Sequence, residues 1–170
     1  IRFNNVKVPK ENIIIGEGQG LKLALTTLNT GRLTLPAASV GIGKWCLYVS
    51  REWSGERKQW GMPIGQHESI GVKLADIAAY TFAMDAMTWM TSFMADDKHK
   101  DIRLEAAIAK YFCTYHSYRI ANETLQIRAG SGYETSDSLR HRGMKSWAVE
   151  RTLRDVRINQ IIEGTSEIMH

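Results

Sequence analysis

The chain has 170 residues, of which 44% are hydrophobic and 24% are charged, with 22 Lys and Arg against 18 Asp and Glu. This length suits one domain with a real core and is too short for several. No apolar run approaches the roughly 20 residues of a bilayer crossing, and the N-terminus lacks the apolar core of a signal peptide. We therefore expect a soluble, unexported protein with no membrane span.

The cysteines and histidines do not indicate a disulfide framework or a metal site. Cys46 and Cys113 lie far apart with no CxxC pairing, and the five histidines show no HxxxH or HExxH spacing. The formal charge of +4 comes largely from residues 140–157, which predict a solvated helix face or a phosphate contact. We expect no nucleic acid partner, since no RNA- or DNA-binding pattern appears.

The opening segment predicts the end of a β-structure. Ile1 and Phe3, and then Val6 and Val8, alternate before Pro9 closes the segment. Strands so short cannot stand alone, so their partners are expected outside this chain. The absence of an initial methionine also suggests a segment of a longer polypeptide.

Helical patterns follow the glycine-rich turn GEGQG. A proline at position 36 predicts a kink or a restart in the first helix. The second helix is apolar on more than one side, which predicts a place near the middle of a bundle. A polar connector, DDKHKD, separates it from the third helix, and a loop through Gly143 leads to the fourth. The four predicted helices cover residues 21–53, 66–95, 102–128 and 147–157.

Five motifs follow one another along the chain in the order that one protein family shows. They read VPKENIIIGEGQG, LNTGR, RKQWGMPIGQHE, QIRAGSGY and RDVRINQIIEGTSEI. Together they resemble the C-terminal third of an acyl-CoA dehydrogenase. The resemblance implies an all-α, antiparallel four-helix-bundle domain over residues 16–170. Residues 1–15 would be a short β lead-in, as the end of the middle β-domain or a linker.

The resemblance implies an FAD-dependent enzyme that forms a double bond between Cα and Cβ of an acyl-CoA thioester. In the commonest subgroup the base stands directly before Gly-Thr, which here is Glu163. A second subgroup places it before the arginine of the first helix, where this chain has Gly31 and no side chain to take a proton. Such a base must be aimed and screened from water, and Ile161 and Ile162 could supply apolar surroundings. The alternative is that Glu163 is a turn residue without a catalytic role.

Further positions carry over from the family motifs. Arg57 could bind a diphosphate through two parallel hydrogen bonds, or could be a solvated loop residue. The QIRAGSGY turn would approach the flavin from a neighbouring subunit, or serve only as a helix C-cap. For Arg32, substrate contact and an internal salt bridge remain equally open. The implied cofactor-binding residues are Arg57, Gln59, Trp60, Glu68, Gln126, Gly130, Thr165, Ser166 and Glu167, and the implied substrate-binding residues are Asn29, Arg32 and Gly164.

Three features depart from the family pattern. Glu68 stands where the family has Gln, Ala129 replaces the first glycine of a pair, and the loop 134–146 is longer than usual. The first two favour an alternative in which the segment is a non-catalytic helical assembly module. An acyl-CoA oxidase is a third possibility.

The resemblance also implies partners for the intact protein. These are an acyl-CoA substrate, an electron-transfer flavoprotein as electron acceptor, and further copies of the chain in a dimer or tetramer. The expected location is the cytoplasm, or the mitochondrial matrix in a eukaryote. We expect the isolated segment to be inactive and to bind little FAD.

Overall fold

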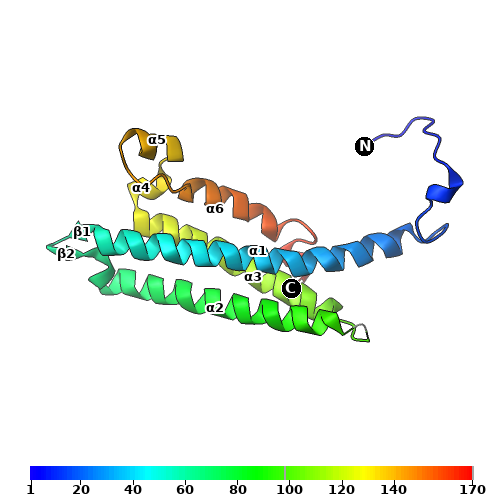
Figure 1. Cartoon of the computed structure of the whole chain (residues 1–170), viewed down its shortest axis with the longest axis horizontal. Coiled ribbons are helices and arrows are strands. Elements are labelled where there is room, and N and C mark those ends of the chain that lie inside the picture. Colours follow the sequence, from blue (N-terminus) through cyan, green and yellow to red (C-terminus); the bar gives the residue numbers. More distant parts are fainter. Residues whose placement is uncertain (98, 170) are drawn as a thin grey trace.

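The structure, a computed structural model, is an all-α bundle, as predicted (Figure 1). It describes residues 1–97 and 99–169; Lys98, in the predicted polar connector, and His170 lie outside the described residues. The predicted helix bounds agree with the observed ones to within three residues. The three long helices and the shorter fourth are α1 (Gly20–Glu56), α2 (Glu68–Asp96), α3 (Arg103–Arg128) and α6 (Val149–Arg157).

The first helix, α1, is continuous over 37 residues, so the predicted restart at Pro36 does not occur. Pro36 is buried inside it and removes one backbone donor without ending the helix. At 1.5 Å per residue, α1 is about 55 Å long. Its N-terminal turns project beyond the bundle, where Leu21 and Leu25 are exposed (Figure 1).

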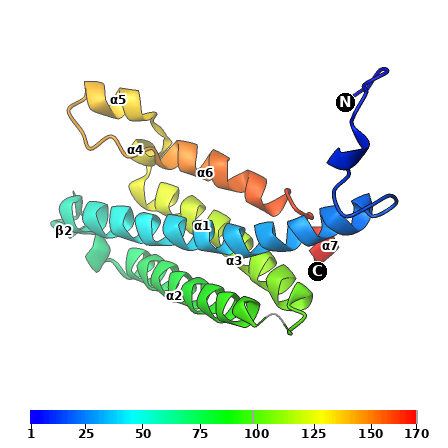
Figure 2. The same ribbon diagram turned by 45° about the vertical axis from the view of Figure 1, so that its right-hand side comes forward.

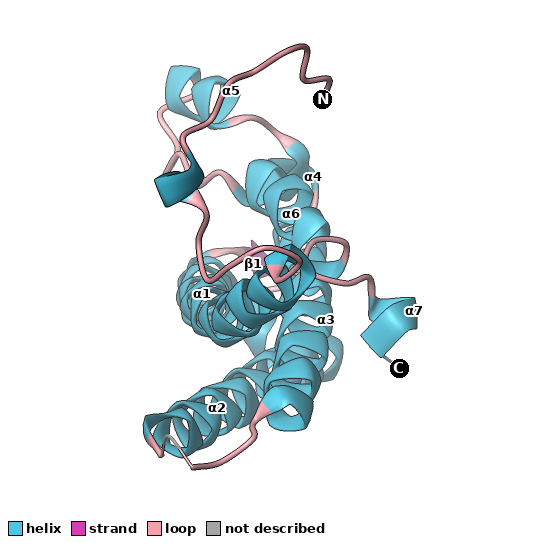
Figure 3. Cartoon of the chain, turned by 90° about the vertical axis from the view of Figure 1, so that its right-hand side faces the viewer, coloured by secondary structure: helices cyan, strands magenta, loops and turns pink. Residues whose placement is uncertain are grey.

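The core lies mainly between α1 and α3, which pack against each other along much of their length (Figure 3). Cys46 and Val49 of α1 and Cys113 of α3 are fully buried, and Ser50 Oγ donates to Thr124 Oγ1 across the contact at 3.2 Å. Our prediction that residues 66–95 lie near the middle of the bundle is wrong for this chain. The second helix, α2, is an outer helix. The prediction failed because an apolar pattern on all sides of a helix does not indicate which of those sides the rest of the chain covers. Its exposed apolar side chains include Phe82, Trp89, Met90 and Phe93.

The segment between α1 and α2 forms a small antiparallel hairpin. Its strands are β1 (Lys58–Gln59) and β2 (Met62–Pro63), and a 3-10 turn, η2 (Ile64–Gln66), follows. Trp60 and Gly61 both have positive φ, 50° and 83°, as the tight turn between right-twisted strands requires.

The segment after α3 contains helices where we predicted a loop. These are α4 (Gly130–Tyr133) and α5 (Ser136–His141), and the Thr135 side chain caps α5 by accepting from the Ser138 amide at 3.3 Å. Beyond α6 come η3 (Ile158–Gln160) and α7 (Ser166–Met169). The last of these, α7, packs on α3 near the projecting half of α1 (Figure 2).

The predicted β lead-in forms no strand here. In residues 1–19 the only regular element is the 3-10 turn η1 (Lys10–Asn12), and Ile1, Phe3, Val6 and Val8 are exposed. No partner strand within the described chain lies beside this segment, so its alternating pattern has nothing to pair with. None of the described helices is long and apolar enough to cross a membrane.

Candidate active site and cofactor groove

Glu163 lies in a tight turn at the C-terminal end of the chain. Its own φ is 58° and that of Gly164 is 106°, so two successive residues occupy the left-handed region. A non-glycine residue there is strained by on the order of 1–3 kcal/mol. Such strain clusters at functional sites.

The Glu163 carboxylate points inward, against α1. Its Oε2 atom is buried, and among the described residues it has no hydrogen-bond partner. A Cβ built on Gly31 would overlap the carboxylate group. The two positions that the family motifs offer for a base therefore converge on one place, and only a glycine at position 31 leaves room for Glu163.

Two basic side chains hold the turn through its backbone. Lys110 Nζ, from α3, donates to the Gly164 carbonyl at 2.6 Å. Arg32 Nε and Nη2, from α1, each donate to the Glu163 carbonyl at 3.4 Å. Neither contact uses the carboxylate, so the turn is fixed while the acidic group stays available.

Lys110 is a site residue that the sequence analysis missed. It is 0% exposed, and burial lowers the pKa of its ammonium while the nearby Glu163 carboxylate acts in the opposite direction. A signal was present, because position 110 follows Ala106 by four residues and precedes Cys113 by three. It therefore lies on the apolar face of α3, where a lysine needs a partner.

The predicted substrate residues gather around this turn. Arg32 forms no ion pair within the described chain, so the internal salt bridge that we left open is not seen. Asn29, half-buried, precedes Arg32 by three residues on the same helix face. Gly164 lies close to Arg32, since a Cβ there would be 3.7 Å from Nη2.

Three predicted cofactor residues follow at the same end of the bundle. The Thr165 carbonyl accepts from the amides of Ile168 and Met169 and so begins α7. The Ser166 hydroxyl donates to the Gln160 carbonyl at 3.4 Å, while Glu167 is exposed.

A second cluster lies at the opposite end of α1. Arg57, Gln59 and Trp60 from the hairpin line one groove together with Gln126 and Ala129 from the end of α3. Gly130 follows directly as the first residue of α4. The groove measures about 380 Å³, at the low end of ligand pockets. Two arginines and a histidine line it, and the described wall carries no carboxylate.

 Ala129 adopts a backbone conformation that suits glycine. Its φ is 50° and its ψ is −134°, a combination that L-residues rarely adopt. This is the position where the family motif has the first glycine of its pair. The backbone of the turn therefore keeps the glycine-like conformation although the residue has changed.

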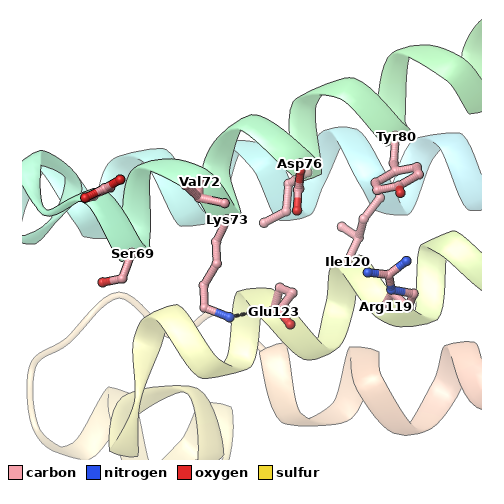
Figure 4. A pocket seen from close by; sticks show the side chains of 10 residues that line it. Ser69, Val72, Lys73, Asp76, Tyr80, Arg119, Ile120 and Glu123 are labelled. Atoms are coloured by element: carbon pink, nitrogen blue, oxygen red, sulfur yellow. Dashed lines mark hydrogen bonds and ion pairs between the residues drawn. The ribbon is translucent and has the colours of Figure 1, made fainter.

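Glu68 lies outside the groove that contains Arg57. It lines a neighbouring groove between α2 and α3, where Lys73 pairs with Glu123 and Arg119 lies near Tyr80 (Figure 4). That wall mixes acidic and basic side chains, unlike the groove around Arg57. The structure thus separates Glu68 from the other residues of its motif.

The two clusters are far apart. Gly31 and Arg57 are 26 residues apart along α1, which corresponds to about 39 Å. Figure 1 shows the hairpin and the C-terminal turn toward opposite ends of the bundle. No flavin ring or phosphate group can therefore contact both clusters of one chain at once.

Comparison with known proteins gives a consistent result. A family model described as "Acyl-CoA dehydrogenase, C-terminal domain" matches residues 18–170. The probable acyl-CoA dehydrogenase FadE10 of Mycobacterium tuberculosis is 52% identical over 168 residues. The match covers 99% of this chain and 26% of FadE10, so the chain spans about a quarter of that relative's length.

Solved structures show the same helical arrangement. Butyryl-CoA dehydrogenase from Megasphaera elsdenii superposes with a TM-score of 0.86 at 34% identity, covering 98% of this chain and 41% of that one. An acyl-CoA dehydrogenase from Bacillus anthracis, complexed with FAD, gives a TM-score of 0.84 at 29% identity, covering 95% of this chain and 29% of that one.

Proposed function

The chain belongs to the acyl-CoA dehydrogenase family, and on this premise we propose that it is the C-terminal helical domain of an FAD-dependent enzyme that desaturates an acyl-CoA thioester between Cα and Cβ. The observation that carries the proposal is the Glu163 carboxylate, whose Oε2 atom is buried without a partner among the described residues and which packs against Gly31.

Glu163 would be the base that removes the α-proton. A proton on carbon next to a thioester is weakly acidic, so its base must be aimed and kept from water. The strained turn and its two backbone anchors, Lys110 and Arg32, support the aiming. The free Oε2 atom supports the proton transfer, because a carboxylate already held in an ion pair would be a poorer acceptor.

The substrate would lie beside the same turn. Asn29, Arg32 and Gly164 offer an amide, a cation and a backbone without a side chain, which suit close approach of a polar thioester. Bound FAD would supply the acceptor for the hydrogen that leaves Cβ. Thr165, Ser166 and Glu167 stand next to the base, where the flavin ring would have to lie.

The groove around Arg57 fits the anionic part of the cofactor. Its arginines and Gln126 are hydrogen-bond donors, and its described wall has no carboxylate to repel a diphosphate. A short ribityl chain joins the ring of FAD to its diphosphate and cannot span the roughly 39 Å between the two clusters. The groove of one chain would therefore serve a cofactor whose ring lies at Glu163 of another, which supports a homo-oligomer.

The remaining assignments follow from the same proposal. Residues 1–15 would be the end of the middle β-domain or a linker, and residues 16–170 the helical domain. The exposed apolar side chains of residues 1–15 support this, because they lack any partner within the described chain. We expect an electron-transfer flavoprotein as electron acceptor, and a cytoplasmic or mitochondrial matrix location.

The test uses the intact protein that carries this domain. The preparation should be yellow with bound FAD and should bleach when acyl-CoA is added without oxygen. Glu163→Gln keeps the shape of the side chain and removes the base, so it should stay yellow and no longer bleach. Bleaching by Glu163→Gln at the parent rate would remove Glu163 from the mechanism.

Two other outcomes would identify the alternatives. A colourless protein that still assembles would indicate a non-catalytic helical module. Stoichiometric peroxide from the reduced protein in air would indicate an acyl-CoA oxidase.

A further inference from the structure

Arg128 is a buried charge with too few partners. It is 1% exposed, and its Nε and Nη1 atoms have no hydrogen-bond partner among the described residues. It is the last residue of α3 and the third residue of the QIRAGSGY turn, two positions after Gln126. Neither the family pattern nor the proposed mechanism gives it a role.

Two indole rings enclose the Arg128 guanidinium. Its Cζ lies 5.0 Å from the ring centre of Trp53, at the end of α1, and 4.8 Å from that of Trp147, before α6. Such cation–π contacts offset only part of the cost of burying an ion. Contact with both rings also restricts the orientation of the planar group.

Carboxylates on α1 and α6, the elements next to the two rings, are paired with other cations. Glu52 and Glu56 both accept from Lys145, at 2.7 and 2.8 Å, and Glu150 pairs with Arg154. Arg128 lines the same groove as Arg57 and Gln126, on a described wall without acidic residues. The Nε and Nη1 donors of Arg128 are therefore left for an acceptor from outside the described chain.

We propose that Arg128 is an anion ligand of this groove and binds a phosphate oxygen of the dinucleotide beside Arg57. The inference rests on the proposed function, since it takes FAD as the occupant. Guanidinium groups suit this task because they stay charged and donate in a fixed plane. The indole rings hold that plane ready, so little freedom is lost on binding.

The test measures binding and stability in the intact protein after removal of FAD. Arg128→Leu should weaken FAD binding by about 10- to 100-fold, the usual effect of losing one charge-assisted hydrogen bond. ADP, which carries the diphosphate without the flavin ring, should weaken by a similar factor. Arg128→Lys should restore part of both affinities, because it keeps the charge and loses the planar fork.

The thermal midpoint of the FAD-free protein separates a ligand from a structural clamp. Replacing a buried, unpaired charge with an apolar residue is often neutral or stabilising. We therefore expect Arg128→Leu to keep or raise the midpoint while affinity falls. Arg151→Leu is the matched control: it removes the same charge from an exposed pair with Asp155, and both readouts should stay unchanged.

Three results would overturn the inference. The first is unchanged FAD and ADP affinity in Arg128→Leu, and the second is weaker FAD binding with unchanged ADP binding. The third is a variant that does not fold while Arg128→Lys folds and binds both ligands as the parent does. Failure of the parent protein itself to bind FAD would instead overturn the proposed function.

Discussion

Glu163 is held by its backbone rather than by its side chain. Lys110 and Arg32 both donate to carbonyl oxygens of the turn, and neither neutralises the carboxylate directly. A salt bridge to the carboxylate would have fixed the residue equally well, but it would have occupied the oxygen atoms that accept a proton in the proposed function. Hydrogen bonds to the main chain can thus hold Glu163 in place and leave its carboxylate free to react.

Lys110 is accordingly expected to act as a positioning residue. Lys110→Met keeps most of the buried volume and removes the hydrogen bond to Gly164, which lets the turn shift. We expect kcat to fall by about 10- to 100-fold, with FAD retained, because small misplacements of a base are costly. Stopped-flow bleaching with acyl-CoA measures this change.

A second variant distinguishes positioning from general damage. In a Glu163→Gln background the Lys110→Met change should have little further effect on the residual rate, because both act on one group. Independent, multiplying effects would contradict the positioning role.

The sequence could indicate Glu163 and Gly31 because both stand in recognisable motifs. It could not indicate that the Glu163 carboxylate fills the space above Gly31, since that contact joins residues 132 positions apart. The apolar face of α3 indicates that Lys110 needs a partner, but the sequence does not identify that partner, because it is the backbone carbonyl of Gly164.

At the scale of elements, the contact between α2 and α3 contains a buried histidine. His116 stacks on Tyr80 with ring centres 4.0 Å apart and lies 4.3 Å from Phe112. Burial, assisted by the charge of Arg119, lowers the pKa of His116 to about 4. The folded chain therefore prefers the neutral ring, whereas the unfolded chain titrates near the ordinary value of about 6.5.

This shift predicts a pH-dependent stability. The stabilisation is fully present above about pH 6.5 and is lost as the pH falls toward 4, because only the unfolded chain binds the proton in that window. We expect a loss on the order of 2 kcal/mol, or roughly 4–8 °C. Thermal unfolding of the 170-residue chain between pH 4 and 7.5 measures it, and His116→Phe should flatten the dependence. An equally steep fall in the variant would assign the effect to other groups.

Element positions were easier to predict than their packing. Periodicity located α1, α2 and α3 because long amphipathic patterns identify helices directly. Periodicity could not show which helix lies at the centre of the bundle, and α2 proved to be an outer helix whose apolar face is partly exposed. The short helices α4 and α5 were missed, because four and six residues hold too little periodicity to register.

At the scale of the whole molecule, the residues of the proposed function form two half-sites rather than one site. Glu163 and its turn lie at one end, and the groove around Arg57 lies at the other, about 39 Å away along α1. Each half needs a complement that this chain does not place beside it. The order of the motifs in the sequence did not reveal this separation. Two motifs of one chain can contact two different cofactor molecules in an oligomer.

The isolated chain should therefore bind FAD poorly. Its groove of about 380 Å³ offers contacts to the diphosphate only, and the ring would have no wall beside it. We expect no saturation of flavin fluorescence quenching at FAD concentrations that saturate the intact protein. Circular dichroism is the control, since a helical, cooperatively melting chain shows that weak binding does not reflect unfolding. Saturable binding of one FAD per chain, with the affinity of the intact protein, would mean that a single copy of this domain holds the cofactor alone and would remove the case for sharing it between subunits.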